Sequence, residues 1–364
     1  MRPAGVQLGG RASDHTAARV RLAALPPLSL YIHVPWCVRK CPYCDFNSHE
    51  LRGALPERDY VAALVADLEH VLPSIWGRPV YTIFFGGGTP SLFSPESVDA
   101  LLQAVRARVR LDAAAEITLE ANPGTVDAEH FAGYRAAGIN RLSIGVQSFD
   151  ERSLKALGRI HDAGQARRAM EAAQRHFDNI NIDLMYALPE QTPAAALADI
   201  EAAVALAPTH LSAYHLTIEP NTLFHRFPPT VPDDDAAAEM QDAIDDRLGR
   251  AGYEHYETSA FARRGFRCAH NLNYWRFGDY IGIGAGAHAK ISFPDRIVRE
   301  MRWKQPRQYL QHAAENPVQE AHEVAVRHLP FEFMMNAFRL VDRFALALYP
   351  ERTRLPLTSV LNQL

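Results

Sequence analysis

The sequence is short of cysteine, of long apolar runs and of net charge, and each shortage excludes a class of protein. Four cysteines in 364 residues are too few for a secreted domain built on disulfides. No apolar run is long enough to cross a bilayer as a helix. A net charge of −4 gives no basic surface for nucleic acid or an anionic membrane. What remains is a globular composition with 48% hydrophobic residues.

The first 26 residues, MRPAGVQLGGRASDHTAARVRLAALP, also lack the continuous apolar segment of a secretory signal. Their alanine- and arginine-rich composition, with Asp14 as the one acidic residue, also occurs in mitochondrial transit peptides. We expect residues 1–26 to be a disordered extension. Three of the four cysteines lie within eight positions, a pattern typical of a metal or redox site in a reducing compartment, so we expect a cytoplasmic protein.

Between residues 27 and 252 the sequence alternates between short β-rich apolar runs and helical patterns. The runs that predict strands are 28–35, 80–86, 116–123, 141–148, 180–188 and 211–219. The stretches that predict helices are 57–72, 94–109, 127–138, 164–177, 193–207 and 233–252. Six strand–helix repeats indicate a parallel sheet but are too few for a closed eight-stranded barrel. We therefore predict an α/β fold with a partial (β/α)6 barrel of the TIM type.

After residue 252 the pattern changes. Glycine, aromatic and polar residues dominate 270–291 (HNLNYWRFGDYIGIGAGAHAKI), and 330–344 reads as a helix. We predict a smaller α+β region over 253–364 that covers the mouth of the barrel.

The motif C-x3-C-x2-C, formed by Cys37, Cys41 and Cys44, directly follows the first predicted strand. Zinc and iron–sulfur sites usually take four protein ligands. Zinc would need a fourth ligand such as His33 or His49, and the sequence lacks the second C-x2-C pair that is typical of structural zinc sites. A [4Fe–4S] cluster held by three cysteines instead leaves one iron open to a small molecule. We favour this open cluster, with the three cysteines as its ligands.

Other candidate residues stand at or near the ends of predicted strands, where barrels of this kind build their active sites. The tract Gly86–Pro90 can bring the backbone close to a ligand, or it can simply form a tight turn. Glu120 and Asp183 could accept hydrogen bonds from ribose hydroxyls, and Arg159 could pair with a carboxylate. The two acids could equally be capped or ion-paired members of the core.

The segment HNLNYW, His270 to Trp275, is the other candidate. Histidine is a common ligand of haem iron, and Tyr274 and Trp275 could stack on a porphyrin. The same segment could be an aromatic packing corner with a hydrogen-bonded histidine. Cys268 could supply a thiolate, although a lone cysteine is more often just buried.

The cysteine motif resembles that of the radical S-adenosylmethionine superfamily. Residues 28–340 resemble its oxygen-independent coproporphyrinogen III oxidase group in the segments LYIHVPWCVRKCPYCDF, FFGGGTPSL, EANPG, RLSIGVQSF, LGRIHD and NIDLMYALP. This resemblance implies a [4Fe–4S] cluster with S-adenosylmethionine on its open iron. It also implies that the cofactor contacts are Tyr31, Tyr43, Gly87, Gly88, Thr89, Glu120, Gln147, Arg159 and Asp183.

Two departures separate the sequence from the oxidase. Phe46 stands where the oxidase carries a further cysteine, and the oxidase's longer N-terminal arm has no counterpart in the residues before 28. With HNxxYW, these features resemble the haem-chaperone branch of the group. That branch implies haem bound near His270, transfer to an acceptor such as a respiratory haem protein at the membrane, and an electron donor. The alternative is the oxidase, which makes protoporphyrinogen IX by radical decarboxylation, so whether the chain is an enzyme stays open.

Overall fold

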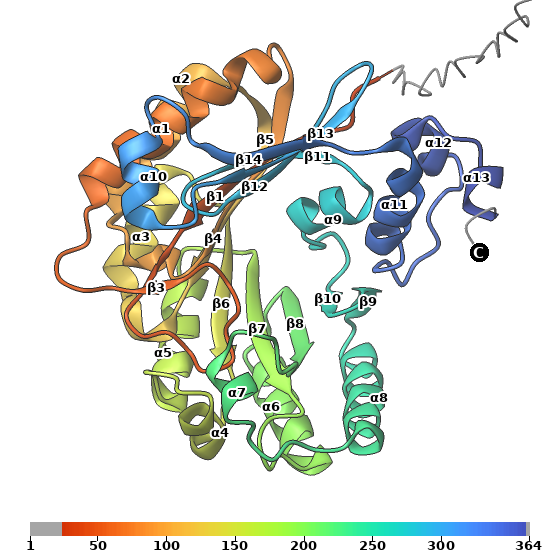
Figure 1. Cartoon of the computed structure of the whole chain (residues 1–364). Coiled ribbons are helices and arrows are strands. Elements are labelled where there is room, and N and C mark those ends of the chain that lie inside the picture. Colours follow the sequence, from red (N-terminus) through yellow and green to blue (C-terminus); the bar gives the residue numbers. More distant parts are fainter. Residues whose placement is uncertain (1–23, 362–364) are drawn as a thin grey trace, which may run out of the picture.

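The structure, a computed structural model, describes residues 24–361, which form one curved sheet with most helices on its outer face (Figure 1). The strand order is β14-β13-β12-β11-β1-β4-β5-β6-β7-β8-β10-β9. Their bounds are β1 Leu28–Val34, β4 Pro79–Gly87, β5 Arg110–Ala121, β6 Arg141–Gln147, β7 Ile180–Tyr186, β8 His210–His215, β9 Glu254–Glu257, β10 Ala260–Ala262, β11 Asp279–Ile283, β12 His288–Ser292, β13 Ile297–Arg302 and β14 Val318–Glu323. A separate pair joins β2 (Trp36–Cys37) to β3 (His49–Glu50).

The six predicted strands correspond to β1, β4, β5, β6, β7 and β8, which run parallel to their neighbours in that order. This confirms the partial (β/α)6 barrel. The helices are α1 Glu57–Val71, α2 Pro95–Arg108, α3 Ala128–Ala137, α4 Glu151–Ala156, α5 Ala163–Gln174, α6 Pro193–Ala205, α7 Leu223–Arg226, α8 Asp234–Arg250, α9 Ala269–Trp275, α10 Pro306–His312, α11 Leu329–Ala337, α12 Leu348–Thr353 and α13 Thr358–Leu361. Six of them match the stretches predicted between 57 and 252.

Local chemistry explains where these helices begin and end. Ser94 is the N-cap of α2, as its sequence predicts, and its hydroxyl accepts a hydrogen bond from the Ser97 N–H at 3.2 Å. Gly138 ends α3 in the left-handed conformation at φ 111°, which glycine adopts without strain. Asp162 and Gln165 form a capping box at the start of α5.

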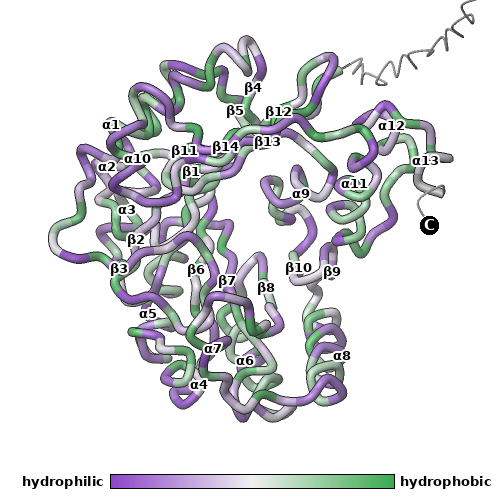
Figure 2. Tube along the Cα trace, viewed as in Figure 1, coloured by the Kyte–Doolittle hydropathy of each residue, from purple (hydrophilic) through white to green (hydrophobic). Residues whose placement is uncertain are grey.

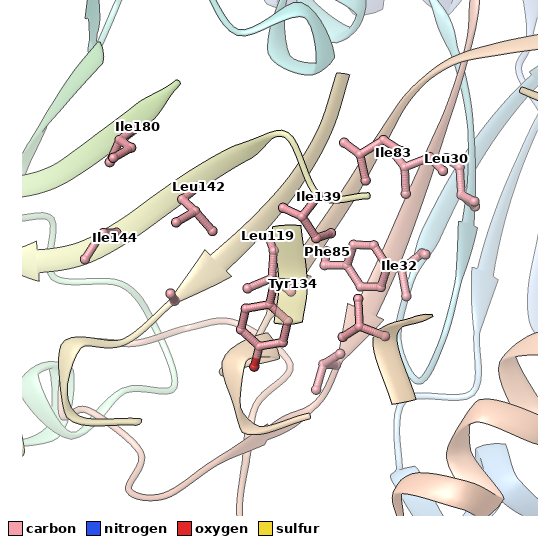
Figure 3. Packing of buried hydrophobic residues seen from close by; sticks show 14 of the residues in the cluster. Leu30, Ile32, Ile83, Phe85, Leu119, Tyr134, Ile139, Leu142, Ile144 and Ile180 are labelled. Carbon is pink, nitrogen blue, oxygen red and sulfur yellow. The ribbon is translucent and has the colours of Figure 1, made fainter. Parts of the chain in front are cut away.

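The side chains of the parallel strands alternate between two faces, as the pleat requires. Apolar residues such as Leu30, Ile83, Phe85 and Leu142 point outward and pack under the helices in one continuous core (Figure 3). Hydropathy along the chain shows the same mixture of apolar and polar residues within single strands (Figure 2). The alternate, inward positions carry polar side chains, which the barrel interior must satisfy with hydrogen bonds.

Residues after 253 form both strands and helices, as expected of an α+β region, but their strands do not form a separate sheet. They widen the same sheet, because β11 pairs parallel with β1 while β10 and β9 extend the opposite edge beyond β8. The helix predicted over 330–344 ends at Ala337. The boundary at 252/253 therefore stays a prediction, and the sheet runs across it.

The extension predicted over 1–26 falls almost wholly on residues 1–23, outside the described residues. Among residues 24–361, no helix is both long and apolar enough to cross a membrane.

Candidate functional site

A cavity of about 370 Å³ opens at the carboxyl ends of the parallel strands. Its walls contain most of the predicted site residues, namely Cys37, Cys41, Tyr43, Cys44, Gly87, Gly88, Thr89, Glu120, Gln147, Arg159 and Asp183. Tyr31 and His270 are the two predicted site residues that do not line it. The lining residues all lie at or before Glu219, so the C-terminal region contributes none, and its predicted role as a cover of the mouth stays a prediction.

The cysteine loop leaves β1 and is held in place by contacts within the loop and by contacts to residues near the C-terminal strands. The Lys40 ammonium donates to the Phe46 and Ser48 carbonyls at 3.2 and 3.1 Å. The Asn47 amide donates to the Ala285 and Lys304 carbonyls, both at 2.9 Å. None of these four bonds uses a thiol, and all three cysteines line the cavity.

The surroundings of the thiols suit metal ligation. Burial raises the pKa of Cys37 and Cys44, so the free thiols are held in their neutral form. Arg159 Nη1 donates to Cys41 Sγ at 3.6 Å, which brings a cation to a sulfur that would be a thiolate in a cluster. Bonding to iron would supply the charge stabilisation that burial removes.

A single zinc ion fits the site less well than a cluster. Within residues 24–361, no three histidine, cysteine, aspartate or glutamate side chains gather so as to hold one metal ion. His33 is also engaged, because Nδ1 lies 3.1 Å from the Tyr31 hydroxyl and Nε2 lies 2.9 Å from the Asn47 carbonyl. A [4Fe–4S] cluster makes a different demand, since each thiolate binds its own iron. The three cysteines therefore stay the predicted ligands of a cluster.

The glycine tract after β4 packs against the cysteine loop. Gly87 has φ 115°, and a Cβ there would lie 2.6 Å from the His33 ring. A Cβ on Gly88 would lie 2.5 Å from the Trp36 carbonyl oxygen. Packing thus requires glycine at both positions. Because neither residue has a side chain, the backbone of Gly87 and Gly88 itself forms part of the cavity wall.

Two carboxyl groups meet inside the cavity. Glu120 accepts a hydrogen bond from the Gly87 N–H at 3.2 Å. Burial, and next the charge of Asp183, raise the pKa of Glu120 to about 8. Burial also raises the pKa of Asp183, although Ser143 and Asn181 each donate to it at 2.8 Å. Neighbouring acids with raised pKa values in a cleft are typical of a binding or catalytic site.

Two further lining residues show signs of strain or incomplete bonding. Gln147 has φ 71°, an unusual backbone conformation for a residue other than glycine. Arg159 Nη2 donates to the Gly145 carbonyl at 2.7 Å, and its buried Nε has no partner among the described residues. A polar ligand in the cavity would satisfy this orphaned donor.

His270 lies apart from this cavity, on α9, which packs against the inner face of β1, β4 and β11 (Figure 1). It is buried, and burial lowers its pKa to about 3, so the ring is neutral. Nδ1 lies 2.8 Å from the Thr82 hydroxyl, whose own hydrogen goes to Ser29, so Nδ1 carries the proton. Nε2 therefore accepts from the Tyr274 hydroxyl at 3.1 Å. In this arrangement neither nitrogen is free for iron, and the haem-ligand role stays a prediction.

A second cavity, of about 200 Å³, lies beside α9 and α11. It is lined by Tyr274, Trp275, Phe277, Gly278, Tyr280, Lys290, Arg299 and Asn336. Its aromatic walls and two cations suit a flat ligand with an anionic edge. Both cations also have partners within the protein, Lys290 with Asp279 and Arg299 with Glu332.

Reasoning from the sequence missed several residues of the main cavity. They are Asp45, Ser48, Asn122, Ser143, Met185, Tyr214, Thr217 and Glu219, among others. Ser143, Met185 and Tyr214 occupy inward positions of their strands, so the two-residue alternation carried a signal for them. Phe46, singled out from the sequence, lies at the mouth and is 61% exposed.

Comparison with known proteins agrees with this geometry. The family model described as "Radical SAM superfamily" matches residues 31–203. The chain is 54% identical over 323 residues to a protein of Escherichia coli (strain K12) named "Heme chaperone HemW", covering 88% of this chain and 85% of that protein. The protein of the same name from Haemophilus influenzae is 49% identical, with 93% and 90% covered. The solved structure of coproporphyrinogen III oxidase (HemN) from Escherichia coli is similar in fold, with a TM-score of 0.78 at 24% identity, covering 91% of this chain and 80% of that one.

Proposed function

Because the chain belongs to the HemW family of the radical SAM superfamily, we propose that it is a haem chaperone, which binds haem and passes it to an acceptor protein. The observation that carries this proposal is the single cavity that collects the three cysteines, the glycine tract and the paired acids, in a chain so similar to proteins named haem chaperones. We further propose that it acts in the cytoplasm, as its cysteine usage predicts.

We propose that Cys37, Cys41 and Cys44 hold a [4Fe–4S] cluster whose fourth iron has no protein ligand. The half-buried thiols face the cavity, and Arg159 stands beside Cys41. Such a cluster, when reduced by an electron donor, supplies single electrons to a ligand on the open iron.

The same cavity is our proposed site for S-adenosylmethionine. The acids Glu120 and Asp183 accept hydrogen bonds and suit ribose hydroxyls, while the unpaired Nε of Arg159 suits a carboxylate. The backbone of Gly87 and Gly88 can approach the ligand closely because no side chain intervenes. We also assign Tyr43, Thr89 and Gln147 to this ligand, as lining residues that the family resemblance implies.

We propose that haem binds at the α9 side of the molecule, beside the cavity lined by Tyr274, Trp275 and Arg299. For His270 to bind iron through Nε2, the Tyr274 hydroxyl must first give up its hydrogen bond. Tyr31 supports this region from the inner face of β1, with its ring 6.5 Å from that of His270. The acceptor that we propose is another haem-requiring protein.

The proposal is tested by titrating the cluster-loaded protein with haem under argon and recording the Soret band. We expect one haem per chain and its loss to a haem-free acceptor protein after mixing. His270→Ala should abolish the histidine-ligated spectrum. Tyr274→Phe, which frees Nε2, should keep that spectrum or strengthen it. Absence of saturable haem binding by the unaltered protein would overturn the proposal. An unchanged spectrum in His270→Ala would overturn the ligand assignment alone.

A further inference from the structure

An unbroken series of buried hydrogen bonds runs through the barrel from the cavity to the start of α9. Asp183 Oδ1 accepts from the Asn181 amide at 2.8 Å, and Asn181 Oδ1 lies 2.6 Å from His210 Nδ1. His210 Nε2 lies 2.8 Å from the Tyr256 hydroxyl, whose oxygen accepts from the Cys268 N–H at 3.2 Å. Cys268 is the N-cap residue of α9, so the series joins the cavity wall to the HNLNYW helix.

The donors and acceptors along this series all point the same way. The amide nitrogen of Asn181 donates to Asp183 and Ser143, so its oxygen must be the acceptor. His210 therefore carries its proton on Nδ1, and its Nε2 accepts from the Tyr256 hydroxyl. Tyr256 in turn is left with a lone pair for the Cys268 N–H. Hydrogen bonds aligned in one direction polarise one another. A change at one end of the series therefore alters the strength of the hydrogen bonds at the other end.

The surroundings of this series of hydrogen bonds keep the His210 ring neutral and hold the far end of the series in place. His210 and Tyr256 are buried, and burial, helped by the nearby Arg141, lowers the pKa of His210 far below its usual value, so the ring stays neutral. At the far end, Glu116 accepts the Ala269 and His270 N–H groups at 3.1 and 3.0 Å. The first turn of α9 thus depends on the half-buried Glu116 and the buried Tyr256, and Tyr256 leads back to the cavity.

We propose that this series of hydrogen bonds couples occupancy of the cavity to the order of α9, with His210 and Tyr256 as positioning residues for the Asp183 carboxylate. The proposal rests on the proposed binding of S-adenosylmethionine in the cavity. A ligand hydroxyl on Asp183 holds the carboxylate in the orientation that accepts from Asn181. The remaining hydrogen bonds of the series, from Asn181 to the Cys268 N–H, are then held more firmly. By linkage, ordering of α9 by a ligand on that side strengthens cofactor binding by the same factor.

Cys268 reports on the coupling. It is fully buried, and it is the one cysteine of the sequence outside the cluster motif, so in the cluster-loaded protein it is the thiol left for alkylation. Its reaction with iodoacetamide requires local opening at the start of α9, which breaks the Tyr256 hydrogen bond. We expect S-adenosylmethionine to slow this alkylation about fivefold, at the low end of typical couplings between sites.

Two tyrosine variants separate the coupling from a loss of packing. Tyr256→Phe removes the hydroxyl that links His210 to Cys268. Tyr253→Phe removes another buried hydroxyl of the same segment, which donates to the Pro208 carbonyl at 2.6 Å and is not part of the series. S-adenosylmethionine should protect Cys268 in Tyr253→Phe and in the unaltered protein, and should give no protection in Tyr256→Phe.

Binding of S-adenosylmethionine is measured on the same samples by equilibrium dialysis. Binding without protection in the unaltered protein, or equal protection in both variants, would overturn the coupling and leave the proposed function standing. No binding at all would overturn the coupling together with the proposed S-adenosylmethionine site. If Tyr256→Phe does not fold, hydrogen exchange of the Ala269 and His270 amides in the unaltered protein decides. Slower exchange with S-adenosylmethionine supports the coupling, and unchanged exchange refutes it.

Discussion

The cavity acid Glu120 should make the proposed binding of S-adenosylmethionine depend on pH. Burial and the Asp183 charge raise the pKa of Glu120 to about 8 in the cofactor-free protein. Ribose hydroxyls donate hydrogen bonds, and an ionised carboxylate accepts them better than a protonated one. Binding must therefore remove the proton from Glu120 below pH 8. The affinity should rise with pH up to about 8 and then level off.

The size of this pH dependence follows from the raised pKa of Glu120. Below pH 8, each unit of pH costs a factor of ten in affinity, or about 1.4 kcal/mol. Because half of the Glu120 carboxyls are already ionised at pH 8, the dissociation constant should rise roughly fiftyfold between pH 8 and pH 6. Glu120→Gln has no proton to lose, so its affinity should be flat above pH 7. At pH 8.5 it should bind roughly ten- to 150-fold more weakly, because a hydrogen bond to a charged group contributes about 1.5–3 kcal/mol.

The assay is equilibrium dialysis of labelled S-adenosylmethionine against the cluster-loaded protein, under argon, from pH 6 to pH 9. Glu57→Gln is the matched control, because Glu57 is an acid that accepts from Ser94 at the start of α2, outside the cavity. This variant should keep the pH dependence of the unaltered protein. A flat profile in the unaltered protein, or the same slope in Glu120→Gln, would refute the reasoning.

Three more changes have defined outcomes. Serine in place of each cysteine of the C-x3-C-x2-C motif should abolish the iron and sulfide content, whereas Cys268→Ser should keep both. Gly88→Ala should destabilise the protein by about 1–3 kcal/mol in urea unfolding and lower its iron content, since the new Cβ would lie 2.5 Å from the Trp36 carbonyl; unaltered stability and iron would contradict the packing argument. Asp67→Asn should cost about 1–3 kcal/mol in the same assay, because the buried Arg302 loses its 2.9 Å partner and keeps only Glu300, and a cost below 1 kcal/mol would show that the Asp67–Arg302 pair is dispensable.

The parallel strands could be predicted because their outward positions are continuously apolar. In β7, Ile180, Ile182 and Leu184 all pack into the core under the helices. The later strands gave no such signal. β14, with the sequence VQEAHE, is an exposed edge strand whose ladder depends on pairing with β13 rather than on burial. Such strands form because a neighbour is already in place, and the sequence does not show that neighbour.

The candidate site followed from the sequence where residues stand at strand ends, since parallel strands bring those ends together. That rule placed the cysteines, the glycine tract, Glu120 and Asp183 around one cavity. The buried series of hydrogen bonds beneath the cavity was missed, although Asn181 and His210 are inward-facing polar residues that alternate with apolar ones in β7 and β8. Their alternation with buried apolar neighbours could have indicated it.

His270 shows what the sequence could not decide. A histidine within HNLNYW is equally compatible with an iron ligand and a packing residue. The difference depends on Thr82, 188 positions away in the chain, which fixes the tautomer and so directs Nε2 to Tyr274. Tertiary contacts of this kind are invisible in a local motif.

We propose that the chain carries haem, and the alternative is a coproporphyrinogen oxidase. This proposal is tested most directly by incubating the reduced, cluster-loaded protein under argon with S-adenosylmethionine, coproporphyrinogen III and haem, then separating the products by chromatography. Our account predicts one bound haem per chain and coproporphyrinogen III with all its carboxyl groups intact. Loss of carboxyl groups, matched by 5′-deoxyadenosine, would contradict it and identify a coproporphyrinogen oxidase.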